Sequence, residues 1–199
     1  MEDQFPLVGG RILLSRSPKS QAYERLRGPD GARWQKAMEA ELANMAEHHV
    51  WDLVPRAEAN KVMTGLWVFR EKETGPKARW CARGFNEPFA DDTYADVLPA
   101  ATMRLLFAFA ASKRYHLRHV DVTAAFLHAP LDVPIYVEQP HAMEVPGNLV
   151  CRLNRAIYGL RTAPRRWQEK LKSCLLNVGF SPFKYDPNVY RRGDELIST

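Results

Sequence analysis

The amino-acid sequence predicts a mixed α+β fold that follows a short N-terminal leader. Apolar residues recur every three to four positions over residues 34–49 and again over residues 167–178, which predicts two amphipathic helices. Between them, short runs rich in Val, Ile, Leu and aromatic residues are separated by Gly and Pro turns, which predicts strands. With 199 residues and 46% hydrophobic content, the chain can bury one good-sized core, or form two small lobes that share a cleft.

The first 33 residues are rich in Gly and Pro and poor in aromatic residues, so we expect a poorly structured leader without a function of its own. Asp30 is a suitable N-cap for the first helix, which we expect to end near His49. The apolar stripe of this helix consists of Trp34, Ala37, Met38, Leu42, Met45 and Ala46.

A β-hairpin is predicted next, with strands at residues 61–72 and 77–85 and a tight turn at 73–76. The twofold period of a strand places Lys77, Arg79, Cys81 and Arg83 on one face, opposite Ala78, Trp80 and Ala82. One face of the hairpin is therefore basic and suits phosphate groups, whereas the other face can pack.

A strongly apolar helix, capped by Thr102 and running from Met103 to Lys113, is expected to belong to the core. It leads into an apolar stretch, residues 118–127, that reads as a buried strand delivering Asp121 into a turn before Phe126. A buried carboxylate is costly unless it has a partner such as a metal ion. The alternative is that Asp121 caps the following turn or helix.

The second half of the chain predicts two further strands, at 135–138 and 149–153, and then a helix that starts at Pro164 and stops at Gly179. The last ten residues or so predict a hairpin around Gly193. We expect the helix from Pro164 to bury Trp167, Leu171, Cys174, Leu175 and Val178 and to expose a basic side.

The net charge of +5 is concentrated in two basic windows, residues 61–85 and 150–172, which suits a polyanionic ligand, although two ordinary solvated faces would have the same composition. Three widely spaced cysteines fit neither a disulfide framework nor a zinc site, and favour a reducing compartment. No secretory leader or membrane-spanning run is present, so we expect a soluble intracellular protein, in the cytoplasm or the nucleus.

Seven segments in a particular order resemble the reverse transcriptase domain of Ty1/copia-type retrotransposon polyproteins, and the resemblance runs from Trp34 to the C-terminus. The segments are Trp34–Glu41 (WQKAMEAE), Trp51–Pro55 (WDLVP), Trp67–Phe85 (ending KARWCARGF), His119–Leu127 (HVDVTAAFL), Ile135–Pro140 (IYVEQP), Val150–Trp167 (VCRLNRAIYGLRTAPRRW) and Gly179–Tyr190.

This resemblance implies the fingers and palm subdomains of a right-hand polymerase, truncated before the Tyr-x-Asp-Asp hairpin of the family. Residues 34–115 would be mostly fingers, and residues 116–199 would be palm with interleaved fingers strands. The implied activity is RNA-directed DNA synthesis, with an RNA template, a DNA primer and deoxynucleoside triphosphates as partners, together with the rest of a retrotransposon polyprotein and no membrane.

The resemblance also implies roles for individual residues. Asp121 would be the catalytic aspartate that binds both Mg²⁺ ions of a two-metal phosphoryl transfer. Phe126 would exclude a ribose 2′-hydroxyl, and the backbone of Val122, Thr123, Ala124 and Ala125 would line the triphosphate site. Lys72 and Arg79 would hold the phosphates of the incoming nucleotide. Template and primer would be bound by Gly159, Arg161, Pro164, Arg165 and Arg166.

The sequence departs from the family pattern in three places: at Thr162, where Gln is usual; at Trp80-Cys81, where Leu-Val is usual; and in the short turn at 73–76. The Tyr-x-Asp-Asp carboxylates are also absent, and one carboxylate cannot hold two Mg²⁺ ions securely. We therefore expect this chain not to polymerise alone. The alternatives are a non-catalytic nucleic-acid-binding remnant of a decayed or repurposed element, and a genomic relic without a stable fold.

Overall fold

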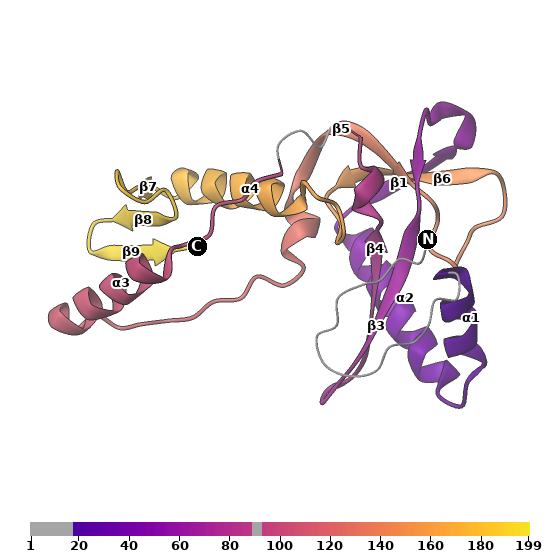
Figure 1. The fold of residues 1–199 in the computed structure, drawn as a ribbon, viewed down its shortest axis with the longest axis horizontal. Helices are drawn as coiled ribbons and strands as arrows, with labels where there is room; N and C mark the ends of the chain where they lie inside the picture. Colours follow the sequence, from indigo (N-terminus) through magenta and orange to yellow (C-terminus); the bar gives the residue numbers. More distant parts are fainter. Residues whose placement is uncertain (1–17, 89–92) are drawn as a thin grey trace.

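The computed structural model describes residues 18–88 and 93–199, and its N-terminal part is a pair of helices (Figure 1). Helix α1 spans Pro18–Arg27 and helix α2 spans Gly31–Glu47, with Asp30 at the N-cap of α2 as predicted. Helix α1 corrects the prediction of a poorly structured leader for residues 18–27, because its Ala22 is fully buried in the core. Residues 1–17 of the predicted leader lie outside the described residues.

A four-stranded sheet follows, in the order β1-β6-β5-β2, and combines strands from both halves of the chain. Strands β1 (Trp51–Pro55) and β6 (Leu149–Arg155) are antiparallel, as are β6 and β5 (Pro130–Val137), whereas the short β2 (Val62–Met63) runs parallel to β5. A single turn of 3₁₀ helix, η1 (Arg56–Glu58), follows β1. The predicted strands at 135–138 and 149–153 are thus confirmed as β5 and β6.

The predicted hairpin is confirmed as β3 (Gly65–Lys72) and β4 (Gly75–Ala82), which form a separate two-stranded sheet. Its register pairs Val68 with Arg79 and Lys72 with Gly75. Ala78, Trp80 and Ala82 are buried while Lys77 is exposed, so the division into an apolar and a basic face is as predicted. Gly75, with a φ of +113°, makes the tight turn possible.

Helix α4 (Ala163–Asn177) begins near Pro164 and ends before Gly179, whose φ is +89°. It is followed by a three-stranded sheet of β7 (Ser181–Pro182), β8 (Val189–Arg192) and β9 (Glu195–Ser198), with the predicted turn at Gly193. Leu175 of α4 packs with Phe180 and Tyr190 in a small second core. Cys174 and Val178 are exposed, however, so the predicted apolar stripe is only partly buried.

Helix α3 (Ala100–Lys113) corrects the prediction of a core helix, since Ala110 is its only buried residue. Its large apolar side chains are exposed, with 69% of Leu105 and 53% of Phe107 accessible to solvent. In the part of the chain that the structure describes, no helix or strand packs extensively against α3, which lies at the end of the molecule far from the β1-β6-β5-β2 sheet (Figure 1). An apolar helix such as α3 is stabilised by burial, but it is buried only if another element packs against it.

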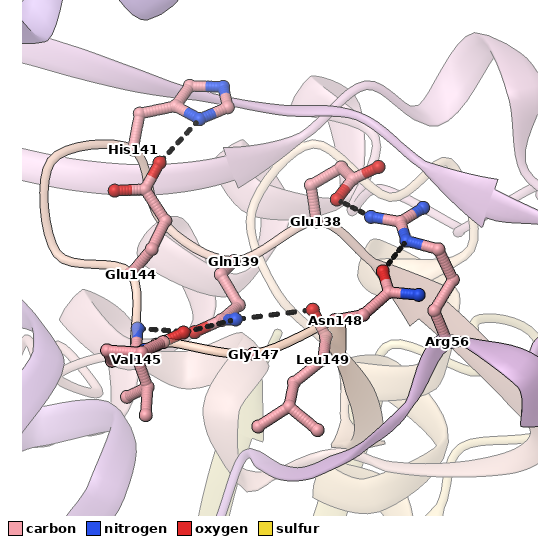
Figure 2. Close-up of a pocket in the computed structure, with 10 residues that line it drawn as sticks. Arg56, Glu138, Gln139, His141, Glu144, Val145, Gly147, Asn148 and Leu149 are labelled. Atoms are coloured by element: carbon pink, nitrogen blue, oxygen red, sulfur yellow. Dashed lines mark hydrogen bonds and ion pairs between the residues drawn. The ribbon is translucent and has the colours of Figure 1, made fainter.

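The connection between β5 and β6 is cross-linked by polar side chains around a depression of about 340 Å³ (Figure 2). The guanidinium of Arg56 donates to Glu138 and to Asn148, and the amide of Gln139 donates to the carbonyls of Val145 and Leu149. The amide oxygen of Gln139 in turn accepts from Val145 N. These bonds supply the backbone partners that an irregular loop needs when it lies against the core.

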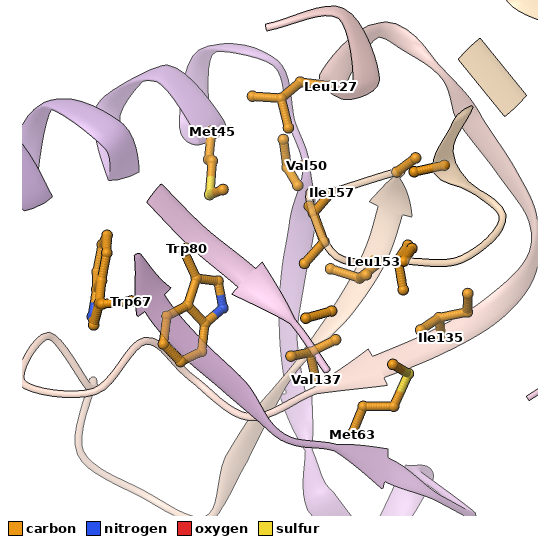
Figure 3. Packing of buried hydrophobic residues seen from close by; sticks show 14 of the residues in the cluster. Met45, Val50, Met63, Trp67, Trp80, Leu127, Ile135, Val137, Leu153 and Ile157 are labelled. Carbon is orange, nitrogen blue, oxygen red and sulfur yellow. The ribbon is translucent and has the colours of Figure 1, made fainter. Parts of the chain in front are cut away.

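The main core lies between helix α2, the hairpin and the four-stranded sheet (Figure 3). Trp67 and Trp80 are fully buried, with ring centroids 5.4 Å apart, and Met45, Leu127, Ile157 and Leu153 continue the cluster. The core therefore joins the hairpin to the turns that precede β5 and α4. Among the described residues, no helix has both the length and the apolar character needed to cross a membrane.

Candidate functional site

Asp121 lies in an exposed segment, residues 115–122, that has neither helical nor strand structure. This corrects the prediction that a buried strand delivers Asp121 into a turn. A strand exists only where its N–H and C=O groups find a partner strand, and none of the described strands pairs with this segment. The cost of burying the carboxylate, which made Asp121 a metal candidate in the sequence, is therefore absent from this structure.

The chain turns sharply between Thr123 and Ala129. Ala124 has a φ of +53°, a left-handed conformation that is strained for any residue with a side chain, and the 3₁₀ helix η3 (Ala125–His128) follows directly. Backbone bonds from Leu127 N to Ala124 O (2.8 Å) and from Ala129 N to Phe126 O (3.0 Å) close the turn. Such strain is often found where a backbone is shaped for a ligand.

Phe126 and Arg79, two of the predicted nucleotide-binding residues, both contact one aromatic ring, that of Tyr158. The Arg79 guanidinium lies over the Tyr158 ring, 4.6 Å from its centroid, and the Phe126 ring contacts the Tyr158 ring in a T-shaped geometry at 5.2 Å. A guanidinium above an aromatic face is held by the ring quadrupole while its N–H groups stay available for other partners. Three distant segments of the sequence, which contain Arg79, Phe126 and Tyr158, are thus in contact.

Burial and neighbouring charges shift the pKa values of residues around Tyr158. Burial raises the pKa of the Tyr158 hydroxyl, Arg79 opposes that rise, and Glu41, Cys81 and Asp121 add to it. Burial also raises the pKa of Glu41, against the attraction of Arg79 and Lys77. Glu41, only 8% exposed, is thus a buried carboxyl close to the basic face of the hairpin.

Lys72, the other predicted phosphate ligand, is not brought next to Arg79. Both residues lie on the same face of the hairpin, but Lys72 is at its tip, paired with Gly75, four residue rows from the Val68–Arg79 pair. That separation is about 13 Å along the strands. The two cations can therefore meet different groups of an extended anion, or the same group only after the hairpin bends.

The predicted template-binding turn packs directly against the end of the hairpin. A Cβ atom on Gly84 would lie 2.1 Å from Gly159 O, and one on Gly159 would lie 2.0 Å from Ala82 O, so both positions need glycine. Ala82 N also donates to Tyr158 O at 2.8 Å. The backbone N–H groups of Arg161 and Thr162 donate to the carboxylate of Glu87, which leaves them unavailable to a template phosphate.

The basic side of helix α4 is partly neutralised within the chain. Arg165 pairs with Glu169 at 2.9 Å, and Arg166 pairs with both Asp132 and Glu169. Arg161 is exposed, and Pro164 is exposed beside it at the start of the helix. Of the predicted template-binding arginines, Arg161 therefore carries the charge that is least compensated by the described residues.

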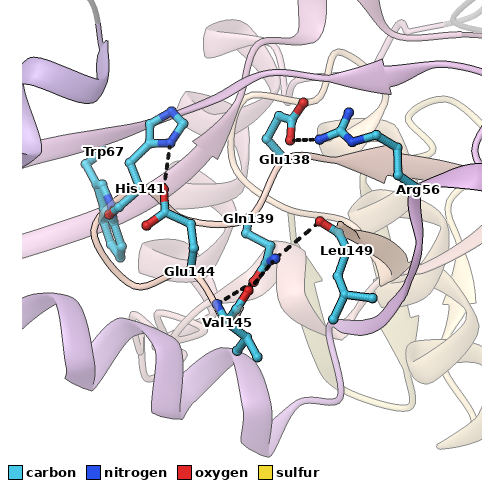
Figure 4. A network of polar contacts seen from close by, with 8 residues as sticks. All are labelled: Arg56, Trp67, Glu138, Gln139, His141, Glu144, Val145 and Leu149. Atoms are coloured by element: carbon cyan, nitrogen blue, oxygen red, sulfur yellow. Dashed lines mark hydrogen bonds and ion pairs between the residues drawn. The ribbon is translucent and has the colours of Figure 1, made fainter. Parts of the chain in front are cut away.

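A polar network that includes Trp67 and His141 connects the core to the loop after β5 (Figure 4). The Trp67 indole donates to His141 O at 2.9 Å, and His141 Nδ1 lies 3.6 Å from Glu144. None of the predicted site residues belongs to this network or to the neighbouring depression. We interpret both as structural.

The described residues do not by themselves fit a site for two Mg²⁺ ions. Within residues 18–88 and 93–199, no three His, Cys, Asp or Glu side chains come together in a way that could hold a metal ion. Asp121 would be one ligand, whereas Mg²⁺ needs several oxygen ligands in octahedral geometry.

Sequence reasoning missed Tyr158, Glu41 and Glu87. Tyr158 lies in the segment Val150–Trp167, but no role was assigned to it, because no neighbouring residue in the sequence shows that its ring lies below Arg79. Glu41 looked like an ordinary polar position on the outer side of α2. Glu87 follows a glycine-containing turn, and only its contacts with residues 74 and 75 positions later reveal its function.

The comparison with known families is decisive for the assignment. The family described as "Reverse transcriptase (RNA-dependent DNA polymerase)" matches residues 48–197, which is most of the chain. The chain belongs to this family. Its curated relatives are polyproteins of copia-type retrotransposons, so the chain is a reverse transcriptase domain of that type, as the resemblance implied.

Three relatives illustrate the range of similarity. The Retrovirus-related Pol polyprotein from transposon RE1 of Arabidopsis thaliana is 30% identical over 94% of this chain, and that from transposon TNT 1-94 of Nicotiana tabacum is 32% identical over 90%. That from transposon RE2 of Arabidopsis thaliana is 34% identical over 83% of the chain. The chain spans 12 to 14% of the length of these relatives. No solved structure matches it significantly.

Proposed function

We propose that this chain forms the nucleotide- and template-binding part of an RNA-directed DNA polymerase, with fingers represented by the β3–β4 hairpin and palm by the residues from 116 onward. The observation that carries the proposal is that Arg79 and Phe126 both contact the Tyr158 ring, with Asp121 five residues before Phe126 in the chain. Arg79 and the 121–126 segment are far apart in the sequence, and together they combine the groups that recognise a nucleoside triphosphate: a cation, an aromatic surface and a carboxylate.

Each group has a distinct task in this proposal. The planar guanidinium of Arg79 donates to two phosphate oxygens at once while the Tyr158 ring supports it from below. The turn that contains Ala124 presents backbone next to the phosphates, and Phe126, seated against Tyr158, takes the position of a sugar-facing residue that rejects a 2′-hydroxyl. Exposed Arg161 and Lys72 extend the positive surface along template and primer.

Polymerisation in this family is expected to use two Mg²⁺ ions, which supply Lewis-acid chemistry at the transferred phosphoryl group. Asp121 would contribute one carboxylate to them. Because no three acidic, His or Cys side chains come together among the described residues, we propose that this chain binds nucleic acid and nucleotide but requires carboxylates from elsewhere for catalysis.

The proposal is tested by binding of an RNA–DNA primer–template at several salt concentrations. We expect an affinity that falls steeply with salt, and for Arg161→Ala a log–log salt slope smaller by about one unit. Arg104→Ala, which also removes an exposed arginine but on helix α3, is the matched control and should leave the slope unchanged. A wild-type chain that binds no primer–template at low salt would disprove the proposed function.

Primer extension tests the catalytic half of the proposal. We expect no Mg²⁺-dependent nucleotide incorporation by the chain alone. Incorporation that disappears in Asp121→Asn would show instead that the chain is a complete polymerase. Binding that is unaffected by Arg79→Ala, Phe126→Ala and Asp121→Asn would favour a nucleic-acid-binding remnant without a nucleotide site.

A further inference from the structure

A buried carboxylate, that of Glu87, connects the hairpin to the start of helix α4. Glu87 is 8% exposed and directly follows the 3₁₀ turn η2 (Gly84–Asn86), which continues from β4. One of its oxygens accepts the N–H groups of Arg161 and Thr162, the latter at 3.3 Å, and the other accepts the Thr162 hydroxyl. All three donors come from the turn that contains Tyr158.

These bonds anchor the N-cap residue of helix α4, Thr162, and the residue before it. The first N–H groups of a helix have no partner inside it, and a Thr at the N-cap normally supplies one with its own hydroxyl oxygen. Thr162 occupies the N-cap but makes no such bond; its hydroxyl donates to Glu87 instead. A carboxylate at this end also interacts favourably with the helix dipole.

The same junction is closed by backbone contacts that leave no room for side chains. Gly84 touches Gly159, and the Ala82 N–H bonds to Tyr158 O at 2.8 Å. A slip of the turn away from the hairpin would leave a buried carboxylate and three donors without partners, which is costly. A buried charge of this kind adds little net stability, but it selects one arrangement over others.

We propose that Glu87 is a positioning residue of the nucleotide site: it locks the turn at residues 158–162 against β4, and so keeps the Tyr158 ring beneath the Arg79 guanidinium. Arg79 lies on β4 itself, three residues before Ala82, so the lock and the guanidinium share one strand. The inference rests on the proposed function, since it assigns Glu87 a task in that site. At position 162, where the family pattern usually has Gln, Thr provides a hydroxyl that donates to Glu87.

The test compares Glu87→Ala with Glu87→Gln in binding of a fluorescent deoxynucleoside triphosphate and of the primer–template. Glu87→Ala removes every acceptor, and we expect triphosphate affinity to fall about tenfold. Glu87→Gln keeps a carbonyl oxygen for the two N–H groups, and its amide can donate to Thr162, so we expect affinity within about threefold of wild type. Amide hydrogen exchange at Arg161 and Thr162 should accelerate in the Ala variant and recover in the Gln variant.

Glu138→Ala is the control, because it also removes a carboxylate with an internal partner, the Arg56 guanidinium, but Glu138 lies in the β5–β6 connection away from Tyr158. It should lower the melting temperature without changing triphosphate affinity. If Glu87→Ala does not fold, Thr162→Val removes only the hydroxyl and should weaken binding about threefold. If Glu87→Ala folds and its triphosphate affinity equals that of the wild type, the inference is wrong. If Glu87→Ala does not fold, unchanged triphosphate affinity in Thr162→Val overturns the inference instead. A wild-type chain that binds neither ligand overturns the proposed function itself.

Discussion

At the scale of single residues, the site depends on side chains whose partners are far away in the sequence. Tyr158 is held by Arg79 and Phe126, and Thr162 by Glu87. The sequence predicted Arg79 and Phe126 through the family resemblance, but it could not predict their common contact, because an aromatic ring in a motif has no local pattern that names its neighbour. Trp80, a departure from the family pattern, is completely buried in the core.

The stacking of Arg79 on Tyr158 can be measured by a double-mutant cycle. We expect Tyr158→Leu and Arg79→Gln to show a coupling of about 0.5–1 kcal/mol in the free energy of unfolding, because the pair is only partly desolvated. Tyr158→Phe keeps the ring and should preserve that coupling. Denaturant unfolding of the single and double variants provides the measurement, and a coupling of zero would show that the contact is absent in solution.

The three thiols should differ in reactivity. Burial raises the pKa of Cys81 to about 11 and that of Cys151 to about 12, while Cys174 is exposed. At about pH 8 we therefore expect alkylation of Cys174 first, and of Cys81 and Cys151 only on unfolding, since the thiolate is the nucleophile. Mass spectrometry after timed alkylation identifies the order. Fast labelling of Cys151 in the native protein would contradict its burial.

The Cys151 thiol also implies a direction for stability against pH. Its pKa is raised in the folded protein above the ordinary value of 9.0, so its contribution to stability is complete below about pH 9 and is lost as pH rises toward 12. Unfolding free energies measured in this alkaline range should fall less steeply for Cys151→Ala than for wild type. Equal slopes would mean that the thiol titrates normally in the folded chain.

At the scale of elements, the helices and hairpins whose signals are local are those that the sequence predicted well. Helix α2, the β3–β4 hairpin and helix α4 follow from residue periods and from turn residues such as Gly75 and Gly179. Segment 115–122 carries an equally apolar pattern but forms no strand, because strand formation depends on a partner rather than on the segment alone. The contact between β4 and the turn before α4 likewise could not be predicted from the sequence.

Two glycines with positive φ provide a matched test of that junction. Gly159 has a φ of +89° and no room for a Cβ beside Ala82 O, whereas Gly193 has a φ of +57° and open space around it. Gly193→Ala should cost about 1–2 kcal/mol for backbone strain alone. Gly159→Ala should cost about 2 kcal/mol more, because the backbones must also separate. Equal losses in chemical denaturation would show that the close contact does not persist.

At the scale of the whole molecule, apolar residues are buried in two cores but exposed on helix α3. One core joins α2, the hairpin and the four-stranded sheet, and a smaller one lies under α4 and the C-terminal sheet. Helix α3 and the segment after it contribute almost nothing to either core. A chain with this distribution has a well-packed core around the proposed nucleotide site and a large exposed apolar surface.

The exposed apolar surface of α3 should make the chain prone to self-association. Met103, Leu105, Phe107 and Phe109 are each at least 40% exposed, and patches of this kind bind apolar dyes and neighbouring molecules. The double substitution Leu105→Gln and Phe107→Gln should reduce dye fluorescence and light scattering, and should change the unfolding free energy by less than about 0.5 kcal/mol. Arg104→Gln serves as a control on the same helix. A loss of several kcal/mol in the double variant would mean that α3 is buried in solution.

The sequence alone was sufficient for the family, for the mixed α+β class and for the elements whose signals are local, because residue periods, caps and turn residues act over a few positions. Only the tertiary structure decided that Arg79 and Phe126 meet at Tyr158, that Glu87 closes the turn before α4, and that Asp121 and α3 are exposed. These outcomes depend on which distant surfaces meet, and burial is a property of the partner that covers a residue as much as of the residue itself.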